Sequence, residues 1–189
     1  MRPALDDYDS FVRIVKPVQW AIDILTCALV FFMARRLGGW VAAWPAFLLA
    51  VANPFLILYA SAILTETLAT FWTTLTLALL IYAGSGDAVP RRARIALILS
   101  GVTAALNTLV RIDGALLLPC LGVPLLFRRP FLPRRTVLLA LLALALTYSP
   151  WIARNLKVFG HPHPLSKFSD IRGREVSYTA FLDWFATWV

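Results

Sequence analysis

Six runs of apolar residues set the first constraint on this chain, because they come in blocks too long for the core of a water-soluble domain. They extend over residues 18–34, 40–59, 63–83, 95–110, 115–127 and 137–148. Hydrophobic residues make up 60% of the 189 residues, whereas soluble domains have roughly 45–50% apolar residues. A run of roughly 20 apolar residues crosses a membrane as a helix. We therefore expect an all-α fold, a polytopic bundle of transmembrane helices with about six membrane crossings.

Arginines in the loops between these runs predict the orientation of the chain. The loops on one face carry Arg35, Arg36, Arg91, Arg92, Arg94, Arg128, Arg129, Arg134 and Arg135. The internal loops on the opposite face carry only Arg111. Short loops rich in arginine stay on the cytoplasmic side, whereas long tails translocate largely regardless of their charge. We expect both termini outside the cell, in a plasma-membrane protein whose net charge of +8 reflects topology rather than binding to nucleic acid.

The predicted organisation has three parts. Residues 1–17 form a polar leader, residues 18–152 form the transmembrane domain, and residues 153–189 form an extracytoplasmic tail. We interpret this tail as the truncated start of a C-terminal region. Cys27 and Cys120 both lie inside apolar runs, so we expect neither a disulfide framework nor a zinc site.

The stretch NPFLILYASAILTET interrupts the second and third runs. A residue before proline disfavours the α-helical conformation, so we expect the helix to break at Asn53-Pro54. A new helix should begin near Ser61 or Thr65, either of which can cap it. Glu66 then lies in the first turn at the mouth of a membrane segment, where a charge is costly without water, a partner or a function. Glu66 is therefore a candidate to act on substrate, bind a metal ion or fix an arginine. The alternative is a carboxylate that only stabilises the helix dipole.

Further candidates lie on the expected outer face. Arg111 and Asp113 flank a sharp bend after the fourth run, and we expect them to pair across it. Arg154 either binds a phosphate through paired donors or extends toward lipid headgroups, with Asn155 beside it as a supporting residue. Asp23 is expected to hydrogen-bond to a neighbouring helix, with a catalytic role as the alternative. Carboxylates and guanidinium groups on one face suit acid–base chemistry on a phosphate-bearing substrate.

The order of several motifs resembles that of a known enzyme family. The motifs are VKPVQWAIDILTCALVFFMARRLGG, NPFLILYASAILTETLATF, LVRIDGALLLP, SPWIARNLKVFGHPHPLS and the terminal FLDWFATW. In this order they resemble the GT-C membrane glycosyltransferases that use polyprenyl-phosphate sugars, closest to the protein-mannosyltransferase and aminoarabinose-transferase-like group. The combination of NP, TE, an arginine after the next hairpin and PWxxRN carries the resemblance.

The resemblance implies an enzyme that transfers a sugar from a polyprenyl-phosphate carrier to a lipid, glycan or protein acceptor on the outer face, with inversion. It implies that Glu66 is the TE carboxylate and that Arg154, with Arg111, contacts the carrier phosphate. Asp6 and Asp7 resemble the acidic motif that acts as general base. No cofactor is implied, and a divalent metal ion stays open.

One departure from the family concerns the leader. Only 17 residues precede the first apolar run, whereas the family has a further helix and a long acidic loop there. We interpret the chain as a partial member and expect no sugar transfer by residues 1–189 alone. The alternatives are a small membrane transporter or lipid scramblase, and a non-catalytic membrane scaffold. A transporter often shows internal repeats with interrupted helices in both halves, but the NP break has no counterpart in the second half.

Overall fold

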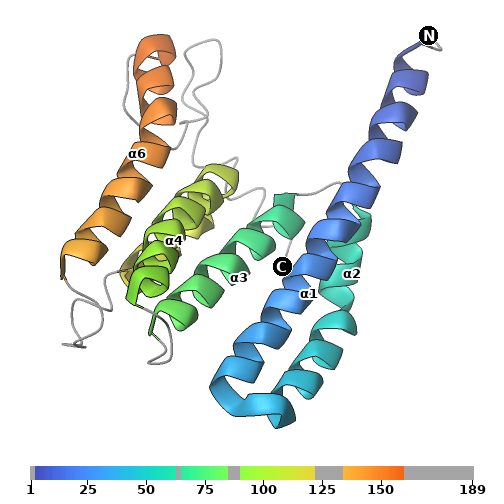
Figure 1. Cartoon of the computed structure of the whole chain (residues 1–189). Helices are drawn as coiled ribbons and strands as arrows, with labels where there is room; N and C mark the ends of the chain where they lie inside the picture. The colour runs from blue at the N-terminus through green and yellow to red at the C-terminus, as the bar shows by residue number, and fades with distance from the viewer. Residues whose placement is uncertain (1–2, 63–64, 85–89, 122–133, 160–189) are drawn as a thin grey trace, which may run out of the picture. The chain divides into compact units, whose positions relative to one another are not determined.

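The computed structural model describes residues 3–62, 65–84, 90–121 and 134–159, and it contains helices and no strands over these residues. The elements are α1 (Pro3–Val51), α2 (Pro54–Ser61), α3 (Thr65–Gly84), α4 (Pro90–Val110), the 3₁₀ helix η1 (Ile112–Leu117) and α6 (Arg134–Phe159). Figure 1 shows them along the chain. The prediction of an all-α fold is confirmed.

Four helical segments are long and apolar enough to cross a membrane. They are Val12–Val51, Thr65–Gly84, Arg91–Val110 and Arg134–Lys157. These segments indicate an integral membrane protein. Six crossings were expected, and this count is not confirmed. Two features bear on the difference: the first segment folds back on itself, and the expected fifth run continues beyond the described residues.

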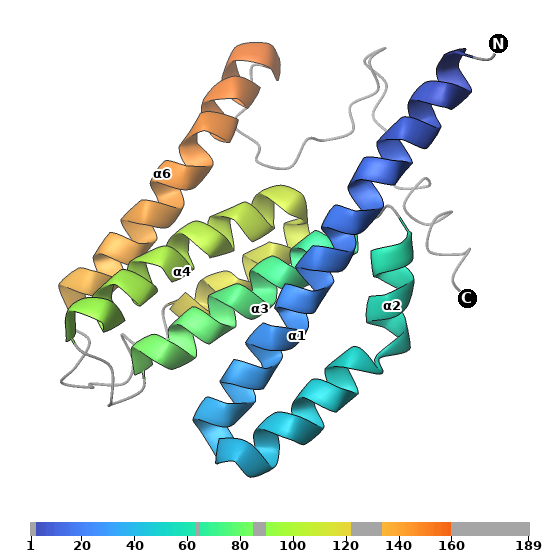
Figure 2. The ribbon, with the colours of Figure 1, turned by 45° about the vertical axis from the view of Figure 1, so that its right-hand side comes forward.

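Helix α1 consists of two limbs joined at Gly39, whose φ of 70° and ψ of −162° are not helical. The ring of Phe31 lies 5.3 Å from that of Trp44 and 6.0 Å from that of Phe47, centroid to centroid. In a straight helix a separation of 16 residues would correspond to roughly 24 Å along the axis. The chain therefore reverses at Gly39, and both ribbon views show the two limbs as a hairpin (Figures 1 and 2). The reversal lies at the predicted boundary between the first and second apolar runs.

The predicted break at Asn53-Pro54 is confirmed. Helix α1 ends at Val51, and Asn53 has extended backbone angles of −70° and 114°. Its side-chain oxygen accepts a hydrogen bond from the backbone N–H of Phe55 at 3.0 Å, so it caps α2. Pro54 fits the first turn of α2 because its missing N–H has no helical partner there. Helix α3 begins at Thr65, one of the two starts that the sequence predicts.

Helices α3 and α4 form an antiparallel pair. Thr76 bonds to Thr103, Thr73 bonds to Asn107 and Glu66 pairs with Arg111. As one residue number falls, the number of its partner rises, which is the signature of antiparallel packing. The two helices have 20 and 21 residues, so the start of α3 and the end of α4 lie at the same end of the pair.

The other end of the pair is apolar, and the first part of α6 packs against it. The buried cluster there consists of Ala83, Ala96, Leu97, Val137 and Ala140. A Cβ atom added to Gly101 of α4 would lie 2.1 Å from the backbone oxygen of Ala140. Only glycine permits this approach between the two backbones.

The chain divides into two units, Met1–Tyr148 and Ser149–Val189, with the boundary inside α6. The described parts of the two predicted polar ends are helical. Residues 3–17 of the expected leader are helical and continuous with the first apolar run. The expected tail begins as helix, because α6 passes through Pro150 and ends at Phe159. Cys27 and Cys120 are both free thiols in the described structure.

Candidate functional site

The candidate site lies where α3 begins and α4 ends. Glu66 is in the first turn of α3, and Arg111 directly follows the last residue of α4. A helix dipole stabilises a carboxylate near its N-terminus and a cation near its C-terminus. The antiparallel packing brings these two favourable positions together, and the sequence separation between them is 45 residues.

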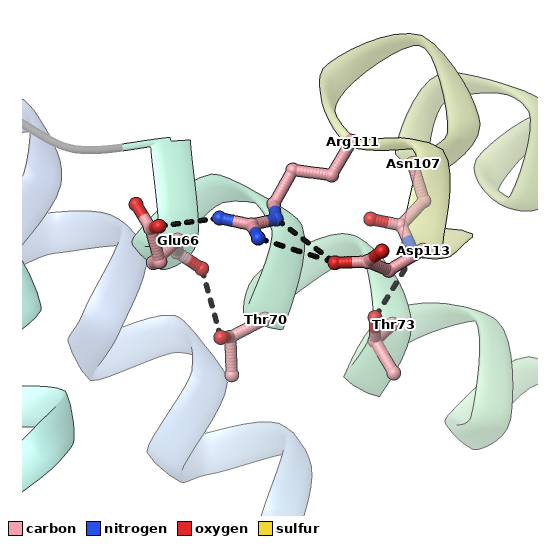
Figure 3. Close-up of polar contacts among 6 residues, drawn as sticks. All are labelled: Glu66, Thr70, Thr73, Asn107, Arg111 and Asp113. Atoms are coloured by element: carbon pink, nitrogen blue, oxygen red, sulfur yellow. Dashed lines mark hydrogen bonds and ion pairs between the residues drawn. The ribbon is translucent and has the colours of Figure 1, made fainter. Parts of the chain in front are cut away.

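Three side chains meet there, and we call Glu66, Arg111 and Asp113 the charged cluster. The Nη1 atom of Arg111 donates to Oε1 of Glu66. Its Nε and Nη2 atoms donate to Oδ2 of Asp113 at 3.3 and 3.1 Å. The guanidinium thus lies between the two carboxylates (Figure 3). The expected pairing of Arg111 with Asp113 is confirmed, and Glu66 adopts the arginine-fixing arrangement among its alternatives.

The sharp bend that carries the cluster depends on Gly114. The backbone of Arg111 is extended, and η1 begins at the next residue. The N–H of Gly114 donates to the carbonyl of Arg111 at 3.0 Å. A Cβ atom at Gly114 would lie 2.6 Å from backbone atoms of Asn107 and Thr108. The turn therefore folds tightly against the last turn of α4, and this places Asp113 beside the guanidinium of Arg111.

The cluster is partly open to its surroundings. The exposed fractions of the side chains are 36% for Arg111, 30% for Glu66 and 63% for Asp113. Burial by itself would lower the pKa of Arg111, but the hydrogen bonds and charges of Asp113 and Glu66 outweigh it, so this pKa lies above its ordinary value. Arg111 is therefore a permanent cation, and the cluster as a whole carries one net negative charge when both carboxylates are ionised.

A row of polar side chains continues from the cluster along the interface of α3 and α4. Nδ2 of Asn107 donates to Oγ1 of Thr73 at 2.9 Å, and the hydroxyls of Thr76 and Thr103 are 2.8 Å apart. Sequence analysis missed these residues. The signal was the recurrence of polar residues every three or four positions on α4, at Ser100, Thr103, Asn107 and Arg111, which share one helix face.

Asn107 has an unusual environment within this row. Its side chain is 2% exposed, and its Oδ1 atom has no hydrogen-bond partner among the described residues. Figure 3 shows this oxygen pointing toward the side on which the Arg111 guanidinium and the Asp113 carboxylate lie. Most buried side-chain acceptors have a donor, so Asn107 marks a place where a donor from outside the described chain would be stabilised.

Arg154 and Asn155 belong to the second unit. Nη1 of Arg154 donates to Oδ1 of Asn155 at 3.4 Å, and its guanidinium lies 5.1 Å from the ring centroid of Trp151. Arg154 is exposed, whereas Asn155 is 2% exposed. This geometry suits both headgroup contact and binding of a carrier phosphate, so the role of Arg154 stays a prediction.

The remaining candidates lie on α1. Asp23 is half-buried. Asp6 and Asp7 lie in the first turns of the helix, and their side chains are outside the described part of the structure. Among the described residues there is no group of three or more histidines, cysteines or carboxylates that could hold a metal ion. The structure thus brings together Glu66, Arg111 and Asp113.

Comparison with known proteins identified no relative of this chain. The sequence matches no protein-family model, and no curated protein or solved structure matches it. The charged cluster is therefore interpreted from its own geometry.

Proposed function

We propose that the protein is a membrane glycosyltransferase, or part of one, that transfers a sugar from a polyprenyl-phosphate carrier to a lipid, glycan or protein acceptor. The observation that carries this proposal is the charged cluster. Its Glu66 comes from the TE of one family-like motif, and Arg111 and Asp113 come from the RID of the next. Two motifs that the sequence separates by an entire helical hairpin thus contribute to one polar site at the end of apolar helices.

In the proposed reaction, the bond between the anomeric carbon and the phosphate oxygen breaks while the acceptor oxygen attacks from the opposite face. Negative charge then builds on the departing phosphate, and a fixed guanidinium is well suited to stabilise it. Arg111 is the phosphate-binding group of the charged cluster in this proposal, and Arg154 of the second unit is a separate candidate for contact with the carrier phosphate. Glu66 holds Arg111 in place, while Asp7 or Asp6 accepts the proton of the acceptor hydroxyl.

The proposed topology has six crossings in the plasma membrane, with the charged cluster on the outer face. The hairpin of α1 supports the higher count, because its two limbs lie in one of the four candidate segments. Helices α3, α4 and α6 and the run that begins in η1 supply the others. The arginine-rich loops are then cytoplasmic, and the membrane itself is the source of the carrier lipid.

The direct test is sugar transfer by membranes of cells that express the protein from its own gene. The membranes receive radiolabelled polyprenyl-phosphate sugars, and labelled products are separated by thin-layer chromatography. We expect transfer that falls about 100-fold or more when Arg111 is changed to Ala, the usual cost of removing a group that stabilises transition-state charge. Arg154→Lys should also lower transfer, because lysine lacks the paired donors.

Lys157→Ala is the matched control, since it removes a neighbouring exposed cation from the same helix and should leave transfer within about twofold. Equal, small losses in Arg154→Lys and Lys157→Ala would assign Arg154 to the lipid headgroups. An unchanged rate in Arg111→Ala, or no transfer from any polyprenyl-phosphate sugar, would refute the proposed function.

A further inference from the structure

The guanidinium of Arg111 is held differently on its two sides. Toward α3, its Nη1 donates to Glu66, whose side chain is 30% exposed. Toward η1, its Nε and Nη2 both donate to a single oxygen of Asp113, whose side chain is 63% exposed. Two parallel donors fit two oxygens of one anion best. Asp113 therefore occupies this pair of donors with one oxygen and leaves the two-oxygen arrangement unfilled.

The local chain explains this incomplete fit. Asp113 is two residues from Arg111 and reaches it from within the same turn, where η1 fixes the backbone between them. Glu66 instead approaches from a separate helix. An ion pair between exposed side chains contributes little, because water solvates both groups when they separate. Asp113 can therefore leave Arg111 at small cost, whereas Glu66 is the more enclosed partner.

Asn107 supplies an independent indication of a ligand at the same place. It lies one turn before Arg111, its side chain is 2% exposed, and its Oδ1 has no donor among the described residues. This oxygen points to the side of the guanidinium where Asp113 lies (Figure 3). A buried acceptor without a donor is costly. A hydroxyl group on the bound molecule would satisfy it.

We propose that Nε and Nη2 of Arg111 form the binding site for the phosphate of a phosphate ester, and that Asp113 fills this site when no ligand is bound. Glu66 retains Nη1 in both states and keeps the guanidinium oriented. This inference rests on the proposed function, in that the phosphate is the one carried by the polyprenyl lipid. It adds that binding is a replacement: the phosphate enters as the carboxylate of Asp113 leaves.

Two single substitutions separate replacement from a simple charge effect. Asp113→Asn and Glu66→Gln each remove one negative charge from the cluster, so attraction of an anion by net charge alone would strengthen in both. Replacement predicts a difference: Asp113→Asn removes the competitor, whereas Glu66→Gln removes the group that orients the arginine. Asp113→Glu keeps a competing carboxylate and serves as the second control at the same position.

The test uses the full chain in phosphatidylcholine nanodiscs, with farnesyl phosphate titrated by isothermal calorimetry against empty nanodiscs. Farnesol tests the contribution of the lipid chain, and inorganic phosphate tests that of the phosphate alone. We expect Asp113→Asn to lower the Kd for farnesyl phosphate about two- to fivefold, the size of an exposed ion pair. Asp113→Glu keeps a competing carboxylate and should lower the Kd less than Asp113→Asn does, whereas Glu66→Gln should raise the Kd. Circular dichroism confirms that each variant keeps its helices.

An equal decrease of the Kd for farnesyl phosphate in Asp113→Asn and Glu66→Gln would overturn the proposal. The proposal would also be overturned if farnesyl phosphate does not bind, or if Asp113→Asn leaves the Kd unchanged or raises it. If Asp113→Asn also lowers the Kd for inorganic phosphate, this result supports the proposal and shows that the phosphate group alone is recognised. No sugar donor is present in this experiment. If no sugar transfer is observed but Asp113→Asn still lowers the Kd for farnesyl phosphate, the glycosyltransferase function is refuted and the phosphate site is supported.

Discussion

The two helical hairpins of the first unit are held together by different chemistry. The limbs of α1 meet through aromatic rings, those of Phe31, Trp44 and Phe47. Helices α3 and α4 meet through hydrogen bonds and an ion pair over most of their length, and through an apolar cluster at one end. Among the described residues, the buried share of the most apolar stretch is half for α4, 22% for α3 and 17% for α1. Helix α4 thus buries the face that carries its polar residues, while most of the apolar stretch of α1 is not covered by these residues.

The difference shows what fixes a helical pair in a membrane. Lipid tails are as apolar as leucine, so apolar contact between helices has little advantage over contact with lipid. The α1 hairpin depends on the short turn at Gly39 to keep its limbs together. The α3–α4 hairpin has polar partners that match in only one register, and this register places Glu66 beside Arg111.

The largest expected effect concerns which side of the membrane the two hairpins present. The proposed topology places the tip of the α1 hairpin inside and the charged cluster outside. In a background with both native cysteines changed to alanine, Leu37→Cys should be shielded from an impermeant thiol reagent in intact cells. Asp113→Cys should be labelled in intact cells, and both introduced cysteines should be labelled in permeabilised cells. Labelling of Leu37→Cys with protection of Asp113→Cys would reverse the proposed orientation.

The next effect tests the close contact on α4. Gly101→Ala places a methyl group against the backbone of Ala140, and we expect a loss of about 3 kcal/mol in the free energy of unfolding, at the upper end of the usual range for overpacking. Unfolding in detergent, followed by circular dichroism, measures it. Gly84→Ala is the control, because no atom of the described residues beyond its own helical turn lies within 4 Å of a Cβ there. An equal effect at both glycines would show that α4 and the first part of α6 are not in close contact.

A smaller loss is expected at the turn of the α1 hairpin. A Cβ at Gly39 meets no atom of the described part of the chain within 4 Å, but its φ of 70° is one that other residues rarely adopt. With ψ near 180°, this conformation is essentially restricted to glycine. Gly39→Ala should therefore cost about 1–2 kcal/mol through backbone strain alone. The same unfolding measurement applies, and a neutral substitution would mean that the limbs do not depend on this turn.

The smallest effect measures one polar contact of the α3–α4 hairpin. A double-mutant cycle of Thr76→Val and Thr103→Val should give a coupling free energy of about 0.6 kcal/mol, as for other hydrogen bonds between membrane helices. The comparison cycle is Phe31→Leu with Phe47→Leu in the α1 hairpin, where we expect a coupling nearer zero because lipid replaces the lost contact. A larger coupling in the aromatic cycle would contradict the distinction between the two hairpins.

The sequence by itself determined the helical class and the places where helices are interrupted. Gly39 reverses α1, Asn53-Pro54 separates α1 from α2, and Gly114 turns the chain after α4. Each interruption follows from steric preferences of one or two residues, which act whatever the rest of the chain does. The pairing of Arg111 with Asp113 was predictable for the same reason, because only one residue separates them.

Only the tertiary structure decided that Glu66 belongs to the same cluster, that Asn107 bonds to Thr73 and that Gly101 lies against Ala140. These contacts depend on the register and rotation of whole helices. The polar positions of α4 indicate which of its faces meets protein, but they do not indicate which residue of α3 lies opposite each of them. The side chains of α3 and α4 acquire their partners only when the two helices pack, and that packing places a carboxylate on each side of Arg111.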